Sequence, residues 1–158
     1  MAGRITKAEA QLKPDPRYGS KVLSRFINCV MGNGKKAVAQ KVVYAALDEI
    51  EKRTKGEPAA IEVFEKAIGR VRPAVEVRSK RVGGQNYQVP MQINKKRQQS
   101  LTFRWIIESA RADSGKPMHI RLSKELMDAS KGEGKAVTIR ENMHRMADAN
   151  RAFSHFAW

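Results

Sequence analysis

The sequence predicts a mainly α-helical single domain of about six helices, with an extended N-terminal arm and a protruding β-hairpin between the third and fourth helices. Apolar residues recur at helical spacing over most of the chain, and this spacing changes to strict alternation only once, within residues 71–93. A length of 158 residues suits one hydrophobic core. We therefore expect one domain over residues 1–158.

The arm is predicted over residues 1–19, which show no helical periodicity. Pro14 and Pro16 lack backbone donors and restrict the residues before them, so this segment should be extended. Helical spacing of apolar side chains begins only after the arm, at Val22 and Leu23.

Three helices are expected before the hairpin, over residues 20–31, 38–53 and 58–69. The first should end at the glycine-containing turn of residues 32–34. The third should stop at Gly69, ahead of Pro73.

Alternation of apolar residues predicts the hairpin over residues 71–93. A two-residue turn at residues 83–84 would pair Val77 with Pro90 and put the apolar faces of the two strands out of phase. A three-residue loop that extends to residue 85 would pair Val77 with Met91 instead. We expect this second register.

Helical spacing returns after the hairpin and predicts three more helices. The fourth covers residues 101–110 and follows the basic run at residues 95–97, and the fifth covers residues 118–131. The sixth follows Gly134, and Met146 is expected on its inward side.

Positive charge is the most informative feature of the composition. The chain holds 31 Lys and Arg against 16 Asp and Glu, a net charge of +15. Residues 70–104 contain nine basic residues and one acidic residue, so more than half of the excess lies there. Such a concentration favours a polyanionic partner, and a nucleic acid in particular.

The sequence shows neither a membrane nor a secretory signal. No stretch is apolar enough to span a bilayer, and the first residues lack the apolar core of a signal peptide. We therefore expect a soluble intracellular protein with no membrane partner.

Enzyme chemistry is not predicted, and neither is a metal or a cofactor. The single cysteine, Cys29, excludes an internal disulfide, and its apolar neighbours predict a core position. Residues 29–36 lack the first glycine and the Ser or Thr of a phosphate-binding loop. Glu141 and His144 have the spacing of a di-metal helix, but no second such pair is present.

Nucleic-acid binding by a basic strip is the remaining function. The hairpin contributes three cations, which are Arg78, Lys80 and Arg81. The run at residues 95–97 and Arg104, one to two turns further on, continue the strip along the fourth helix. Tyr87 supplies a ring that could stack on an unpaired base.

Several strings of residues resemble those of a known family. They include VEVRSKRVGG at 75–84, YQVP at 87–90, HRMA at 144–147, FIN at 26–28 and GKK at 34–36. On these strings the chain resembles the family of small ribosomal subunit protein seven, bacterial and organellar type, over nearly its whole length. The resemblance implies a helical domain with a protruding β-hairpin.

The same resemblance implies the partners of the protein. It would be a structural constituent of the small ribosomal subunit that binds the 3′ major domain of the ribosomal RNA and helps to nucleate assembly of the subunit head. It would lie near the mRNA exit path and the exit-site tRNA, beside other head proteins and platform protein eleven. Its location would be the cytoplasmic ribosome, or the ribosome of an organelle.

Two groups of site residues follow from the resemblance. The implied ribosomal RNA contacts are Arg4, Lys7, Lys35, Lys36, Arg72, Arg78, Lys95, Lys96, Arg97 and Arg104. The implied hairpin tip, near exit-site tRNA and mRNA, comprises Lys80, Arg81, Val82, Gly83, Gly84 and Tyr87. The arm departs from the family, because it lacks the usual opening cluster of arginines.

Two other functions compete with this interpretation. Residues 20–50 form two predicted helices joined by a short turn, as in DNA-binding helix-turn-helix proteins. The second helix is mostly Ala and Val beyond Lys36, however, which is typical of a core helix rather than a recognition helix. A basic protein that binds only other proteins would leave the charge of residues 70–104 without a role.

Overall fold

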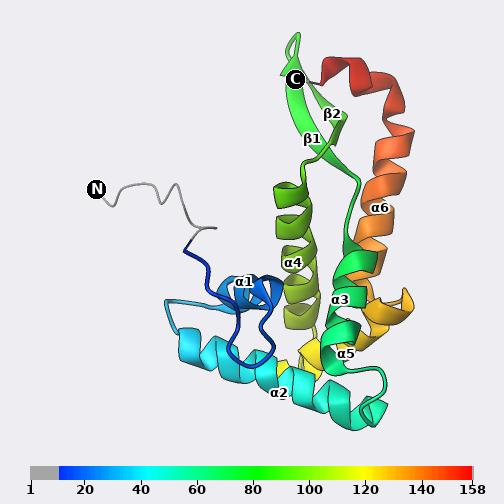
Figure 1. Cartoon of the computed structure of the whole chain (residues 1–158). Helices are drawn as coiled ribbons and strands as arrows, with labels where there is room; N and C mark the ends of the chain where they lie inside the picture. The colour runs from blue at the N-terminus through cyan, green and yellow to red at the C-terminus, as the bar shows by residue number, and fades with distance from the viewer. Residues whose placement is uncertain (1–10, 158) are drawn as a thin grey trace.

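The computed structural model describes residues 11–157, and within that range it contains six α-helices, a two-stranded antiparallel sheet and a short 3-10 helix. The elements follow the order α1 (Lys21–Val30), α2 (Lys36–Thr54), α3 (Ala60–Val71), β1 (Val75–Val82), β2 (Gln85–Gln92), α4 (Lys95–Ala112), α5 (Met118–Lys131), α6 (Lys135–Ala149) and η1 (Arg151–Phe156). The predicted fold class is confirmed, since the chain is mainly helical and the hairpin lies between α3 and α4 (Figure 1).

The hydrophobic core lies between the helices, and all six α-helices contribute to it. At its centre Phe26 of α1 packs edge-on against Phe64 of α3 and Phe103 of α4, with ring centroids 5.3 Å apart in both pairs. α5 packs against α2, α3 and α4, and its Leu122 and Leu126 are buried. Edge-on aromatic pairs add to the stabilisation from buried apolar area, so this cluster fixes how α1, α3 and α4 pack together.

Side-chain caps begin two of the helices. α1 starts close to where the sequence predicts it, whereas α4 starts at Lys95, before the predicted residue 101, so the basic run at residues 95–97 forms its first turn. The N–H of Leu23 donates to Ser20 Oγ at the start of α1, over 3.3 Å. The N–H of Arg97 donates to Asn94 Oδ1 at the start of α4, over 2.9 Å. Each cap satisfies a backbone donor that has no partner inside its own helix.

α3 is longer than predicted, because it continues through Gly69 to Val71. Val71 is fully buried in the core, and this burial outweighs the roughly 1 kcal/mol by which glycine disfavours a helix. The helix ends at Val71, and the backbone of the next residue, Arg72, is extended, as is favoured for a residue before proline. The strands therefore occupy residues 75–92 rather than the whole of residues 71–93.

The hairpin pairs in the register that the apolar pattern disfavoured. Val77 lies opposite Pro90, so the expected pairing with Met91 across a three-residue loop is wrong. Gly83 and Gly84 both have positive φ, 57° and 89°, and form a two-residue turn. Such a turn matches the natural twist of the two strands.

Matching of apolar faces was a poor guide to the register because one face of the hairpin mixes charged and apolar residues. Glu76 and Arg78 of β1 lie opposite Met91 and Val89 of β2. Val89 is fully buried, and Glu76 is only 7% exposed. A buried carboxylate is tolerated where it is paired, and the partners of Glu76 are described below.

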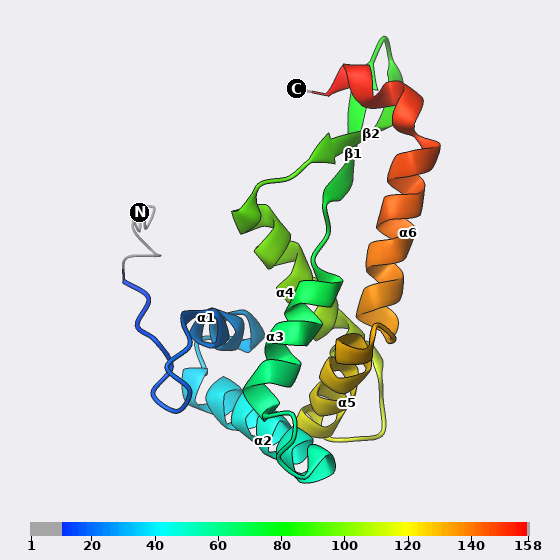
Figure 2. The same ribbon diagram turned by 45° about the vertical axis from the view of Figure 1, so that its right-hand side comes forward.

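The hairpin extends from the helical body beside the C-terminal part of the chain (Figures 1 and 2). α6 packs against β1, and η1 packs against β2. In both views residues 11–19 of the arm and α1 lie on the other side of α3 and α4 from α6. One flank of the hairpin is therefore covered by α6 and η1.

Two expectations about buried residues are wrong. Cys29 is exposed, because helical geometry turns it away from the side of α1 that Leu23, Ile27 and Val30 bury. Met146 is 46% exposed, because it lies at the edge of the side of α6 on which Ala147 is buried.

Candidate nucleic-acid interface

The first turn of α4 carries three successive cations, Lys95, Lys96 and Arg97, and no acidic residue. Positive side chains at a helix N-terminus are repelled by the positive end of the helix dipole, and no acidic side chain of the same turn offsets this repulsion. An anion bound there would interact favourably with the side chains and with the backbone N–H groups of the first turn. This turn is therefore suited to hold a phosphate group.

One side of α4 continues the positive surface. Lys96, Ser100 and Arg104 are exposed and recur at every fourth position, so they line up along the helix. All other residues between 101 and 107 are buried. Arg104 is thus carried outward by a helix that the core holds in place.

Arg97 takes part in an ion pair within the protein. Its Nε donates to Glu76 Oε2 over 3.0 Å, and its Nη2 donates to Glu76 Oε1 over 2.6 Å. Arg78 Nη2 donates to the same carboxylate over 3.3 Å. The hydrogen bond from Arg97 is the main reason that the pKa of Glu76 lies below its ordinary value. The side chains of Arg97 and Arg78 remain 33% and 44% exposed, so both still reach the surface.

The hairpin tip is tied to the C-terminal segment. Arg81, Gly83 and Gly84 are exposed, but Lys80 is half-buried. Lys80 Nζ donates to the carbonyl oxygen of Phe156 in η1 over 2.8 Å. The tip therefore combines an exposed turn with a lysine that holds the end of the chain.

Tyr87 also contacts the C-terminal segment. Its ring centroid lies 5.2 Å from that of Phe153 and 5.3 Å from that of Phe156, and its hydroxyl donates to Gln85 Oε1 over 3.0 Å. Stacking of Tyr87 on an unpaired base stays a prediction, and the ring already has two aromatic neighbours. The concentration of aromatic residues after residue 152 was the only sign of this contact in the sequence.

A second basic group lies at the turn between α1 and α2. Lys35 and Lys36 are exposed, and Asn33 and Gly34 make the turn with φ of 52° and 73°. The N–H of Lys36 donates to the carbonyl oxygen of Gly34 over 2.8 Å, and no side chain of the N-cap residue bonds the N–H groups that follow in the first turn of α2. These donors and the two lysines are therefore suited to hold a second anion.

α4 extends between the two basic groups. Its first residue, Lys95, follows the hairpin, whereas Arg111 in its last turn lines a groove together with Lys35. An 18-residue helix is about 27 Å long. A nucleic acid that contacts both groups has to follow the length of α4.

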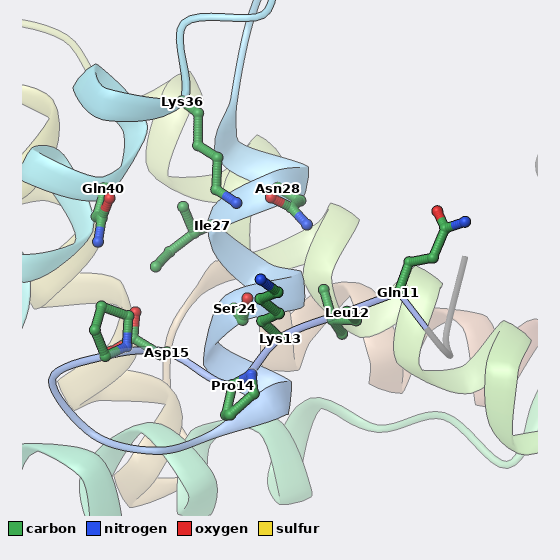
Figure 3. Close-up of a pocket in the computed structure, with 11 residues that line it drawn as sticks. Gln11, Leu12, Lys13, Pro14, Asp15, Ser24, Ile27, Asn28, Lys36 and Gln40 are labelled. Atoms are coloured by element: carbon green, nitrogen blue, oxygen red, sulfur yellow. The ribbon is translucent and has the colours of Figure 1, made fainter. Parts of the chain in front are cut away.

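The arm, α1 and the start of α2 enclose a pocket of about 620 Å³ (Figure 3). Its walls are residues 11–16 of the arm, Ser24, Ile27 and Asn28 of α1, and Lys36 and Gln40 of α2. Nothing in the sequence pattern indicates this pocket, because local periodicity does not show how residues 11–16 pack against two helices.

The remaining predicted RNA contacts say less about the interface. Arg72 is exposed at the end of α3, whereas Arg4 and Lys7 lie outside the described residues. Within residues 11–157, no three His, Cys, Asp or Glu side chains are grouped so that they could hold a metal ion. No helix in the same range is both long and apolar enough to cross a membrane.

Comparison with known proteins finds relatives that match the chain along its length. A family model described as ribosomal protein S7p/S5e matches residues 2–151. A protein named "Small ribosomal subunit protein uS7" from Rhodopirellula baltica is 58% identical over 156 residues, which cover 99% of each chain. A protein of the same name from Xanthobacter autotrophicus is 52% identical over 158 residues, which cover 100% of each chain. Another from Chromohalobacter salexigens is 47% identical over 156 residues, which cover 99% of each chain.

Proposed function

The chain belongs to the ribosomal protein S7p/S5e family, and we propose that it binds the 3′ major domain of small-subunit ribosomal RNA and helps to nucleate assembly of the subunit head. As a member of this family it is a structural protein of the small ribosomal subunit, associated with the ribosome and its RNA, and not an enzyme. The finer role rests on the basic surface of α4.

The first turn of α4 is the observation that carries the proposal. Its three cations are repelled by the positive end of the helix dipole, and a bound phosphate group would interact favourably with both the side chains and the dipole. Direct phosphate contacts are proposed for Lys35, Lys36, Arg72, Lys95, Lys96 and Arg104, which are all exposed. Arg78 and Arg97 contribute through the parts of their side chains that the pairing with Glu76 leaves exposed.

The hairpin tip forms a second part of the proposal. Residues 80–84 and Tyr87 lie near the mRNA exit path and the exit-site tRNA in the assembled subunit, and other head proteins and platform protein eleven are neighbours. Support comes from the shape of the fold, because the tip extends beyond the helical core and presents Arg81 to solvent. A tip of this kind can reach a second RNA while α4 holds the first.

Binding to three nucleic acids tests the proposal. The affinity of the full chain is measured for a fragment of the ribosomal RNA 3′ major domain, for tRNA and for duplex DNA, at one stated physiological salt concentration. We expect the ribosomal RNA fragment to bind most tightly. Equal or tighter binding to duplex DNA would support the helix-turn-helix alternative and overturn the proposal, and absence of all binding would favour a protein that contacts only other proteins.

A pair of charge variants tests whether α4 is the binding surface. Lys96→Ala combined with Arg104→Ala should weaken binding to the ribosomal RNA fragment. Lys52→Ala combined with Lys66→Ala removes the same charge from exposed positions on α2 and α3 and should have a smaller effect. Equal effects of the two double variants would mean that only net charge matters.

A further inference from the structure

The pocket between the arm, α1 and α2 has no role in the function proposed so far. We propose that it holds one unpaired nucleotide of the ribosomal RNA, with the base inside the pocket and the phosphate between Lys13 and Lys36. This inference rests on the proposed function, because the nucleotide belongs to the RNA that the protein binds.

The pocket has a suitable size and position for a nucleotide. Its volume of about 620 Å³ lies within the range of roughly 300 to 1,000 Å³ that is usual for sites of small molecules. Lys36, which lines the pocket, belongs to the basic group at the start of α2. An RNA strand held by this group passes the pocket, so a base that is not paired can turn into it.

Two lysines meet in the pocket from different elements. Figure 3 shows Lys13 of the arm and Lys36 of α2 with both side chains pointing into the same space. Two ammonium groups that face one space repel each other unless an anion lies between them. The first N–H groups of α2, which lack a side-chain cap, lie at the same end of the helix as Lys36 and favour the same anion.

The acidic residue of the pocket lining does not neutralise these lysines. Asp15 is 3% exposed, and its carboxylate is occupied by donors of the protein. The N–H groups of Arg17 and Tyr18 donate to its Oδ2, each over 3.1 Å, and the hydroxyl of Tyr44 donates to its Oδ1 over 2.7 Å. The pocket therefore presents a positive charge to a ligand.

The inner surface of the pocket fits a base. Leu12 and Ile27 provide apolar surface, and Asn28 and Gln40 provide amide groups. Gln40 Nε2 donates to the hydroxyl of Tyr44 over 2.8 Å, which leaves the carbonyl oxygen of its side chain to accept a bond from a base N–H. Proteins recognise an unpaired base by contact with its face and by hydrogen bonds to its edges, and here aliphatic side chains take the place of the more usual aromatic ring.

The wall formed by the arm is held in place by contacts with α2. Arg17 Nη2 donates to Asp48 Oδ1 over 2.5 Å. The Arg17 guanidinium carbon also lies 5.2 Å and 5.6 Å from the ring centroids of Tyr18 and Tyr44. A site that is ordered before binding loses less conformational entropy when a ligand enters, so the pocket is suited to a weak ligand such as one nucleotide.

Two other occupants are outcomes of the test. Residues 1–10 of the chain are close in sequence, but Arg4 and Lys7 make this segment a poor match for a positive pocket. An acidic segment of another protein would match the charge, but it would leave the amide groups and the apolar surface without a specific role. RNA fits all three features.

The test combines base removal with filling of the pocket. Ribosomal RNA fragments that each lack one unpaired base are bound to the wild-type chain and to Asn28→Phe, whose ring fills the pocket without changing the charge. We expect one missing base to weaken wild-type binding about tenfold, near the lower end of the effect known for a base stacked on an aromatic ring, because the contacts here are aliphatic and amide contacts. Asn28→Phe should weaken binding of the intact fragment to a similar extent and lose the sensitivity to that base.

Controls separate this inference from general effects. Asn142→Phe makes the same change at an exposed position of α6 and should leave the sensitivity to the base unchanged. If Asn28→Phe does not fold, a photoreactive amino acid at Leu12 replaces it, and it should cross-link to one unpaired nucleotide of the fragment. Cross-linking to residues 1–10, or to another protein in assembled subunits, would overturn the inference.

The two proposals fail in different ways. If the wild-type chain binds the fragment but removal of each base weakens binding of the wild type and of Asn28→Phe equally, the nucleotide site is refuted and the proposed function stands. If the chain does not bind the fragment at all, both are refuted.

Discussion

Arg97 of α4 and Glu76 of β1 are joined by two hydrogen bonds with N–O distances of 3.0 and 2.6 Å. Because Glu76 is only 7% exposed, its charge is stabilised by arginines more than by water. The pair connects the hairpin to the first turn of the helix that carries the basic surface. The orientation of the hairpin therefore depends on an arginine that the family resemblance assigns to RNA contact.

Arg97→Ala should destabilise the protein more than substitution of an exposed charge usually does. The substitution leaves the Glu76 carboxylate with only the longer hydrogen bond from Arg78. We expect the free energy of unfolding to fall by about 1 to 3 kcal/mol, measured with urea. Lys95→Ala, at an exposed position two residues away, should change it by less than about 0.5 kcal/mol. Equal effects would show that the pair has no structural role.

The stability of the protein should depend on the ionisation of Glu76. Hydrogen bonding from Arg97 lowers the pKa of this carboxyl from its ordinary value of 4.5. A carboxyl with a lowered pKa in the folded state adds stability above its unfolded pKa, and this stability is lost as the pH falls through the folded pKa. We therefore expect the free energy of unfolding to fall more steeply below about pH 4.5 in the wild type than in Glu76→Gln. Parallel curves for the two proteins would contradict this account.

Much of the helical fold could be predicted because it depends on residues that are close in sequence. The apolar spacing and the Ser20 cap define α1, and the exposed row of α4 follows from the same periodicity. Exposure of Lys35, Lys36 and Arg104 was predictable for the same reason.

The other features depend on partners that are far apart in sequence. The register of the hairpin puts Glu76 on the buried face, which is tolerated only because Arg97 lies 21 residues further on. Packing of Phe153 on Tyr87 spans a still longer separation. One wall of the pocket is joined to α2 by the hydrogen bond that Asp15 of the arm accepts from Tyr44, a contact that no local pattern indicates.

The turn at Gly83 should accept Asn and reject Val. Its φ of 57° lies in the left-handed region, which Asn adopts far more readily than a β-branched residue does. Gly83→Val should destabilise the hairpin by about 1 to 2 kcal/mol, whereas Gly83→Asn should have little effect. Hydrogen exchange of the β1 and β2 backbone amides measures this difference. If both variants exchange as slowly as the wild type, the two-residue turn does not limit the stability of the hairpin.

Binding to the ribosomal RNA fragment should weaken steeply as the salt concentration rises. Each phosphate contact contributes roughly 0.7 to 0.9 to the slope of log affinity against log salt. The double variant Lys96→Ala and Arg104→Ala should therefore reduce this slope by about 1.5. The control pair, Lys52→Ala and Lys66→Ala, should leave the slope almost unchanged. A flat titration of the wild type would remove the argument for a phosphate-binding surface on α4.

Replacement of residues 80–87 by a short turn should separate the function of the hairpin tip from the stability of the protein. No residue of this segment belongs to the hydrophobic core between the helices, so helical circular dichroism and cooperative unfolding should be nearly unchanged. Binding to the ribosomal RNA fragment should weaken only in part, because Lys35, Lys36 and Arg104 remain.

In assembled subunits the same replacement should alter retention of exit-site tRNA or fidelity of the reading frame, since the proposed function brings the tip close to that tRNA. The replacement also removes the Lys80 bond to Phe156 and the Tyr87 contact with Phe153, so it releases η1 as well. Phe153→Ala is the matched control, because it removes the η1 side of the contact with Tyr87 while every residue of the tip stays in place. If Phe153→Ala alters tRNA retention as strongly as the replacement does, the effect belongs to the C-terminal segment. If the shortened protein unfolds, or supports unaltered retention and fidelity, the hairpin tip does not have the separate role proposed for it.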